Sequence, residues 1–219
     1  MTVLVGARWG HRPQRVGVAE VQINTRKIML QSTTNQPIPM IEEHEATSEV
    51  AEIFDAVKRD MQVLTVPNMM KTMGVSPAAL AIHWGMFQAV VAHLTLPHSL
   101  MAMIGYTVAE YGNCEYCSVN GELFCRNLGI DEDILAQVAQ DLGNVNPQRV
   151  RVILEFSVKM AHDPKSITHE DFDRMREFGV SDEEILEIVL LAAHAVSADI
   201  IADTLRVPVE TAVYAALGR

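Results

Sequence analysis

The chain has 219 residues, of which 49% are hydrophobic and 21% are charged, a composition typical of a folded globular protein. Its formal net charge of −11 disfavours nucleic acid and anionic membrane surfaces as partners, because both repel an acidic surface. Three cysteines are too few for the disulfide framework of a secreted protein, so we expect a cytoplasmic protein.

The first part of the chain differs from the rest. Residues 1–40 contain scattered Val and Ile without a helical period and include the polar segment 31–37. This pattern predicts an irregular N-terminal arm. Residues 1–10 lack the apolar segment of a signal peptide, which agrees with a cytoplasmic location. Residues 41–219 are expected to form a single helical domain.

Helical signals dominate after residue 40, and no strand-like alternation appears there. Apolar residues at spacings of three and four, with Ser, Asp or Pro at helix starts, predict a series of helices. We expect helices at about 48–61, 77–91, 97–112 and 114–128, from 131, at 147–160, from 168, from 181 and after 208, and a short turn at 69–73. The most apolar stretch, 185–201, contains Glu187, His194 and Asp199, which indicates a buried core helix and not a membrane span. The predicted fold class is therefore all-α, a multi-helix bundle.

The one chemically distinctive feature is the dithiol Cys114-Glu115-Tyr116-Cys117 at a predicted helix start. A helix N-terminus favours thiolate over thiol, and two intervening residues let the sulfurs form a disulfide. Such a pair can attack a peroxide or a disulfide and then resolve the product. The alternatives are a zinc site, which needs a histidine to complete four ligands, and two inert buried thiols. Cys125 lies about 12 Å along the helix from Cys117 and is expected in the core.

Three further histidines lie within apolar helical segments. They are His83, His93 and His194. Their spacing does not match the HxxxH or HExxH pairing of metal ligands. We therefore interpret them as core or interface residues.

Residues 106–117, Tyr-Thr-Val-Ala-Glu-Tyr-Gly-Asn-Cys-Glu-Tyr-Cys, resemble the signature of the alkylhydroperoxidase D-like, carboxymuconolactone decarboxylase superfamily. Segments 66–77, 178–189 and 202–205 are similar to that family as well, so the resemblance covers roughly residues 41–210. It implies an all-α fold and assembly as trimers or hexamers. Activities in the superfamily range from dithiol-dependent reduction of hydroperoxides to lactone decarboxylation without cysteines. We expect no cofactor and no metal ion.

The chain departs from the peroxidase members at their proton relay. The resemblance places a relay glutamate twelve residues before the first cysteine and a relay histidine four after the second, and these positions hold Ala102 and Gly121. Neither side chain can move a proton. Candidate replacements are Glu110, four residues before the first cysteine, and His98, one helical turn before Ala102; both could equally be surface residues at helix ends. Tyr116, where some members have a histidine, can donate a hydrogen bond near the sulfurs.

The leading hypothesis is a thiol–disulfide oxidoreductase that reduces hydroperoxides. The resemblance favours Cys117 as the attacking thiol and Cys114 as the resolving one, with a thioredoxin-like or lipoyl-bearing protein as the electron donor. One alternative is a non-redox, carboxymuconolactone decarboxylase-like enzyme acting on a small organic acid, in which His98 or Glu110 moves protons. Another is a non-catalytic oligomer that has lost the relay.

Overall fold

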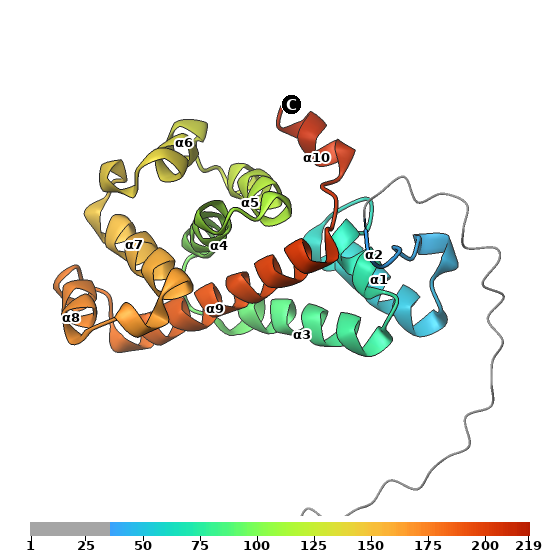
Figure 1. Ribbon diagram of the computed structural model, residues 1–219, viewed down its shortest axis with the longest axis horizontal. Helices are drawn as coiled ribbons and strands as arrows, with labels where there is room; N and C mark the ends of the chain where they lie inside the picture. Colours follow the sequence, from blue (N-terminus) through green and yellow to red (C-terminus); the bar gives the residue numbers. More distant parts are fainter. Residues whose placement is uncertain (1–35) are drawn as a thin grey trace, which may run out of the picture. The chain divides into compact units, whose positions relative to one another are not determined.

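A computed structural model describes residues 36–219 of the chain (Figure 1). The predicted N-terminal arm therefore lies outside the described residues, except for the irregular residues 36–40. The described residues form ten α-helices and no β-strand, which confirms the all-α fold class. The helices are α1 (Ser48–Met61), α2 (Asn68–Met73), α3 (Pro77–His93), α4 (His98–Gly112), α5 (Glu115–Asn127), α6 (Glu132–Gln140), α7 (Gln148–His162), α8 (His169–Glu177), α9 (Asp182–Leu205) and α10 (Thr211–Ala216). Of three short 3-10 turns, η1 (Glu43–Glu45) precedes α1, η2 (Leu142–Asn144) lies between α6 and α7, and η3 (Pro164–Ser166) lies between α7 and α8.

Helix boundaries follow local capping chemistry. The Ser76 hydroxyl accepts a hydrogen bond from the Ala79 N–H at the start of α3. Ser181 and Glu184 form a capping box at the start of α9. Gly179, with φ +75°, reverses the chain between α8 and α9 in a left-handed conformation that disfavours other residues.

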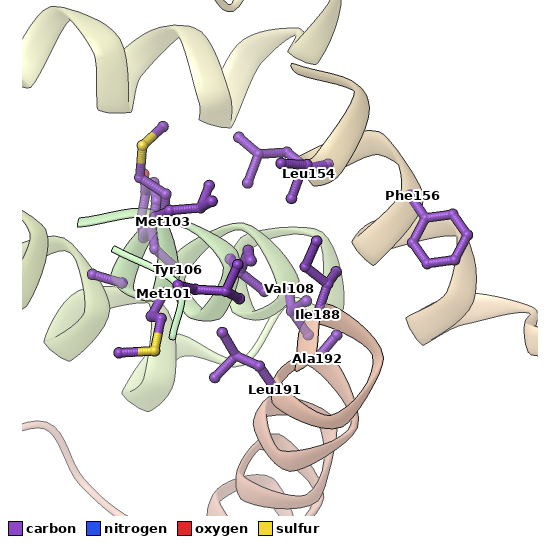
Figure 2. Close-up of a cluster of buried hydrophobic side chains, with 14 of the residues drawn as sticks. Met101, Met103, Tyr106, Val108, Leu154, Phe156, Ile188, Leu191 and Ala192 are labelled. Atoms are coloured by element: carbon purple, nitrogen blue, oxygen red, sulfur yellow. The ribbon is translucent and has the colours of Figure 1, made fainter. Parts of the chain in front are cut away.

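The main hydrophobic core surrounds α4. This helix packs against α5, α7 and α9 (Figure 1), and nine of its fifteen residues are buried. Figure 2 shows Met103 and Val108 of α4 among Leu154 of α7 and Ile188 and Leu191 of α9. Because α4 is enclosed and leads directly into α5, it fixes where the dithiol begins.

The long helix α9 is apolar along most of its length. By length and composition it is the one described helix able to cross a membrane, yet it contributes Ile185, Ile188 and Leu191 to the main core. One of its carboxylates also makes hydrogen bonds that connect α9 to the segment before α4. Glu187 accepts hydrogen bonds from the backbone N–H groups of Thr95, at 2.9 Å, and Leu96, at 3.1 Å, just before α4 begins. These contacts agree with the interpretation of α9 as a core helix.

Two smaller apolar clusters complete the described fold. One lies among α1, α3 and the segment around α2, where Phe54, Leu80 and Trp84 pack together. The other is built where α2, α5 and the end of α9 meet, and it contains Cys114 and Tyr116. The dithiol therefore lies at the junction of three helices that are far apart in the sequence.

Candidate active site: a dithiol beside a buried carboxylate

The chain turns sharply between α4 and α5, immediately before the first cysteine. Asn113 ends α4 in a left-handed conformation, with φ +57°, and its N–H caps the carbonyls of Ala109 and Glu110. Cys114 is the N-cap of α5, and its Sγ accepts a hydrogen bond from the Cys117 N–H at 3.4 Å. The dithiol helix is thus capped by Cys114, whereas Asn113 ends the preceding helix.

The two thiols of the dithiol differ in exposure. Both are free, but Cys114 is 0% exposed, whereas Cys117 is half-buried and lines a cavity. Cys125 is likewise fully buried, in the main core, where burial and the charge of Glu122 raise its pKa to about 12. Cys117 is therefore the thiol that a small molecule in the cavity would meet first, and Cys125 is an inert core residue.

A carboxylate that was not among the site residues predicted from the sequence lies beside the dithiol. Asp199 of α9 is only 8% exposed, and one of its oxygens lies with the two sulfurs in a group whose atoms are all within 4.8 Å of one another. Gly112 makes room for it, because a Cβ at this position would lie 3.2 Å from Asp199 Oδ2. Asp199 Oδ1 is buried and has no hydrogen-bond partner among the described residues.

The electrostatics of this group favour its protonated forms. Burial raises the pKa of Asp199, and hydrogen bonds with the Cys117 and Cys114 thiols offset this only in part. The pKa of Cys117 is raised by its hydrogen bond with Cys114, by burial and by the neighbouring Asp199. These effects at Cys117 oppose the lowering of the pKa that the helix N-terminus is expected to produce. The thiol needs a base to become reactive, and the nearest carboxylate is Asp199.

A largely apolar cavity of about 320 Å³ opens beside the dithiol. Cys117 and Asp199 lie on its wall, and so do both vacant relay positions, Ala102 and Gly121. The apolar part of the wall includes Met61, Met69, Met70, Phe87, Val90, Val91, Met101, Phe124 and Leu191. The small residues at the relay positions thus enlarge a space that glutamate and histidine side chains would partly fill.

Gly121 also sets the distance between α4 and α5. A Cβ at this position would lie 3.2 Å from Tyr106 Cα and 3.4 Å from Tyr106 Cβ. The two helices are therefore close here, and a histidine at position 121 would have to push them apart. Gly121, which stands where the resemblance places a relay histidine, is thus part of the contact between α4 and α5.

The structure separates the two predicted replacements for the relay. Glu110 is half-buried on α4 but lies beside Tyr106, Glu122 and Arg219 and does not line the cavity; burial raises its pKa. His98 is exposed at the start of α4 and does line the cavity, as does Ala102 one turn later. The structure therefore brings His98, but not Glu110, to the same cavity as the dithiol, and a catalytic role for either stays a prediction.

The hydroxyl of Tyr116 is engaged away from the sulfurs. It accepts a hydrogen bond from the Met69 N–H at 3.1 Å and donates one to Glu210 Oε1 at 3.2 Å. Glu210 also accepts from the Asn68 N–H at 2.5 Å and from Asn120 Nδ2 at 3.4 Å. Because its single O–H already has a partner, Tyr116 joins α2, α5 and the C-terminal segment and is placed as a structural residue.

Tyr116→Phe is accordingly expected to lower the free energy of unfolding by about 1–3 kcal/mol, because it leaves the buried Met69 N–H without an acceptor. Urea denaturation followed by circular dichroism measures this change. Tyr214→Phe is the matched control, since Tyr214 also bonds a carboxylate, Glu115, but on the exposed surface. Equal stabilities for both variants would contradict the structural role of Tyr116.

The histidines interpreted as core or interface residues need a correction. His83 of α3 and His194 of α9 both line the cavity, with ring centroids 6.2 Å apart. Burial and the facing His194 lower the pKa of His83 to about 4, and burial lowers that of His194. His93 lies outside this cavity, in a groove between α3 and α9. Spacing alone could not find the pair, because its members come from different helices.

The ligating atoms of the site are soft sulfurs and one carboxylate. Cys114, Cys117 and Asp199 are placed so that they could together hold a metal ion. The zinc alternative considered from the sequence required a histidine as a further ligand, and the third group of this cluster is a carboxylate. The fold and the site together define an all-helical protein with a buried CxxC dithiol, a neighbouring carboxylate and an adjacent apolar cavity.

Solved structures with the same fold confirm the expected architecture. A peroxidase-related protein with an alkylhydroperoxidase AhpD core from Ralstonia eutropha JMP134 superposes with a TM-score of 0.75 and 20% identity, covering 84% of this chain and 96% of the other. A peroxidase-related protein from Silicibacter sp. TM1040 has a TM-score of 0.73 and 19% identity, covering 84% and 98%. The debrominase Bmp8 has a TM-score of 0.70 and 18% identity, covering 85% and 98%, and a cysteine-to-alanine variant of it was solved with 2,3,4-tribromopyrrole. No protein-family model and no curated protein matches the chain. The chain therefore has the alkylhydroperoxidase D-like fold.

Proposed function

We propose that this protein is a dithiol oxidoreductase that reduces an organic hydroperoxide inside the apolar cavity. The observation that carries the proposal is the placement of Cys117 on the cavity wall, with the Cys114 sulfur and the Asp199 carboxylate within 4.8 Å. A buried second thiol next to an accessible one is what a resolving cysteine requires. A carboxylate whose pKa is raised by burial is a stronger base than a free one, which suits it to take a proton from a thiol and return it.

The reaction is written in two steps. Asp199 takes the proton of the Cys117 thiol while the sulfur attacks the distal oxygen of the hydroperoxide, the O–O bond breaks, and the alcohol leaves with the proton that Asp199 returns. Cys117 is now a sulfenic acid. The Cys114 sulfur then attacks Cys117 Sγ, water leaves, and a disulfide forms. Two thiols and one hydroperoxide thus give one disulfide, one alcohol and one water.

Turnover requires a two-electron donor that reopens the disulfide. Since Cys114 is fully buried, the donor has to reach Cys117 through the cavity. A lipoyl group on a flexible arm suits this approach, and a thioredoxin-like protein is the other donor class that we expect. The disulfide form of this protein should therefore be reduced by dihydrolipoamide.

The proposal is tested by adding cumene hydroperoxide to the reduced protein and following thiols and products by mass spectrometry. We expect loss of the Cys114 and Cys117 thiols in equal amount to the cumyl alcohol formed, with Cys125 left reduced. If Cys114 and Cys117 stay reduced while a control peroxidase consumes the same hydroperoxide, hydroperoxide reduction is excluded.

A brominated aromatic ring is a second candidate electron acceptor, favoured by the apolar cavity and by the debrominase among the similar structures. The same dithiol would accept bromine from carbon at Cys117, Asp199 would protonate the carbon, and Cys114 would displace bromide as the disulfide forms. Incubating the reduced protein with 2,3,4-tribromopyrrole tests this reaction. Release of bromide in equal amount to the disulfide is expected, and disulfide-free protein with intact substrate would exclude it.

We also propose that copies of the chain assemble through an apolar face on α3 and α9. This face exposes large apolar side chains without a partner in the described part of the chain, and they are Ile82, Met86, Leu186, Leu190 and Ile200. Such a surface favours association because burying it removes apolar area from water. Light scattering is expected to give the mass of a trimer or a hexamer. A monomer at all concentrations would contradict the proposal.

A further inference from the structure

The helix α9 presents one continuous stripe to the cavity. Its residues are Leu191, His194, Ala195, Ala198 and Asp199, which recur at the spacings of three and four that place side chains on one helix face. Polar groups stand at His194 and Asp199, and the two cavity-lining residues between them, Ala195 and Ala198, are alanines. Since each residue advances a helix by 1.5 Å, these two polar groups are separated by about 7.5 Å along the axis.

The polar group remote from the dithiol is a pair of facing imidazoles. His83 and His194 approach from α3 and α9 with their ring centroids 6.2 Å apart, and both line the cavity. His194 Nδ1 is buried and has no hydrogen-bond partner among the described residues. Buried polar atoms are usually paired, so a group without a partner on a cavity wall points to a ligand that supplies one.

The chemistry of the pair selects a neutral ligand group. The lowered pKa values leave both imidazoles uncharged at neutral pH, so they offer an anion no counter-charge. A neutral imidazole has one nitrogen that donates and one that accepts. A hydroxyl can do either, and it therefore satisfies His194 Nδ1 in whichever tautomer the ring adopts.

We propose that the His83–His194 pair is a recognition site for a hydroxyl group, so that the cavity binds a small apolar molecule about one aromatic ring long with a hydroxyl at the end opposite the dithiol. Phe87 and Leu191 line the cavity and supply apolar contact for the ring, and Ala195 and Ala198 leave space for it. That this molecule is the substrate rests on the proposed dithiol function, whereas its binding does not.

Binding to the reduced, full-length protein tests the site without any redox step. The probes are 4-isopropylphenol, its isostere 4-isopropyltoluene, in which a methyl group replaces the hydroxyl, and 4-isopropylbenzoate, all measured by isothermal titration calorimetry or ligand-observed NMR. We expect the phenol to bind about five-fold to ten-fold more tightly than the toluene, the ratio that one net hydrogen bond of about 1–1.4 kcal/mol produces. The benzoate should bind no more tightly than the toluene.

Variants assign the preference to the imidazoles. His194→Phe keeps an aromatic ring but removes the nitrogens, and it should bring the ratio of phenol to toluene affinity close to one. His83→Phe is the second test if His194→Phe does not fold, and it should reduce the same ratio. His93→Phe is the matched control, because His93 lies outside the cavity, and it should leave the ratio unchanged.

Three results would overturn the site: equal affinity of the wild-type protein for phenol and toluene, a preference that survives in His194→Phe, or tightest binding of the benzoate. A failure of dithiol chemistry would appear elsewhere, as unchanged thiols in the hydroperoxide experiment. The two proposals can therefore fail separately.

Discussion

Cys117→Ser is expected to abolish hydroperoxide reduction, whereas Cys114→Ser should stop the reaction after one attack. Cys117 lines the cavity and Cys114 is fully buried behind it, so only Cys117 can meet the substrate first. Removing a nucleophile costs on the order of 10⁶-fold in a well-studied serine protease. A loss of at least about 10³-fold is expected here, down to the background rate.

The two variants are distinguished by the intermediate that they accumulate. Without its resolving partner, Cys117 should persist as a sulfenic acid, which dimedone traps as a stable adduct visible by mass spectrometry. Cys125→Ser is the control, since Cys125 lies in the main core away from the cavity. A dimedone adduct on Cys114 in the Cys117→Ser variant would reverse the two roles. Conversion of a small organic acid that survives replacement of both cysteines would instead favour the non-redox alternative.

Much of the fold could be predicted from the sequence because its helices carry strong local signals. The capping box at Ser181 and Glu184 and the chain reversal at Gly179 are both visible as residue types in order, and the structure has both. The turn before the dithiol was harder to predict from the sequence. Asn is favoured both at a helix N-cap and in the left-handed conformation that ends a helix, and the structure uses Asn113 for the second.

The site was less predictable, because its partners meet only in the folded chain. Glu110 was selected for its closeness to Cys114 in sequence, but α4 ends between them and the side chain turns to Tyr106. Asp199 was overlooked although a carboxylate within an apolar helix is an unusual residue. Its position beside the sulfurs depends on how α9 crosses the start of α5, and no local pattern encodes that crossing.

The two positions that the resemblance assigns to the proton relay also shape the cavity. Ala102 and Gly121 both line the cavity, and Gly121 lets α4 and α5 approach closely. Small residues there carry no titratable group and leave apolar space beside Cys117. Proton transfer can then come from another wall of the cavity, where Asp199 lies. Small side chains at these two positions are thus compatible with a bulkier substrate than glutamate and histidine side chains there would allow.

Asp199→Asn is expected to lower hydroperoxide reduction by about 10²–10⁴-fold, the usual effect of removing a positioned general base. The amide keeps the shape of the side chain but cannot take the Cys117 proton. Asp203→Asn is the matched control, because Asp203 lies one helical turn further on α9, is exposed and does not line the cavity. Stopped-flow measurement of thiol oxidation gives the rates of both variants.

Alkylation of Cys117 by iodoacetamide separates a base from a mere neighbouring charge. If Asp199 removes the thiol proton, Asp199→Asn should be alkylated more slowly at neutral pH. If the carboxylate acts only through its negative charge, which raises the pKa of Cys117, the variant should be alkylated faster wherever Asp199 is ionised and the Cys117 thiol is still largely protonated. The second outcome would remove Asp199 from the proposed mechanism.

The stability of the same variant should change in the opposite direction to its activity. The pKa of Asp199 is raised by burial, so the folded protein holds this proton more tightly than the unfolded chain does. The stabilisation that comes with protonation is complete below the unfolded pKa of about 3.9 and is lost as pH rises through the higher folded value. Above that value the wild type carries a buried, incompletely paired charge that Asp199→Asn lacks. The melting temperature of the variant should therefore exceed that of the wild type at high pH, and the gain should shrink as pH falls through the folded pKa of Asp199. A carboxylate that weakens the fold when it is ionised but accelerates the reaction is explained by its chemistry and not by packing.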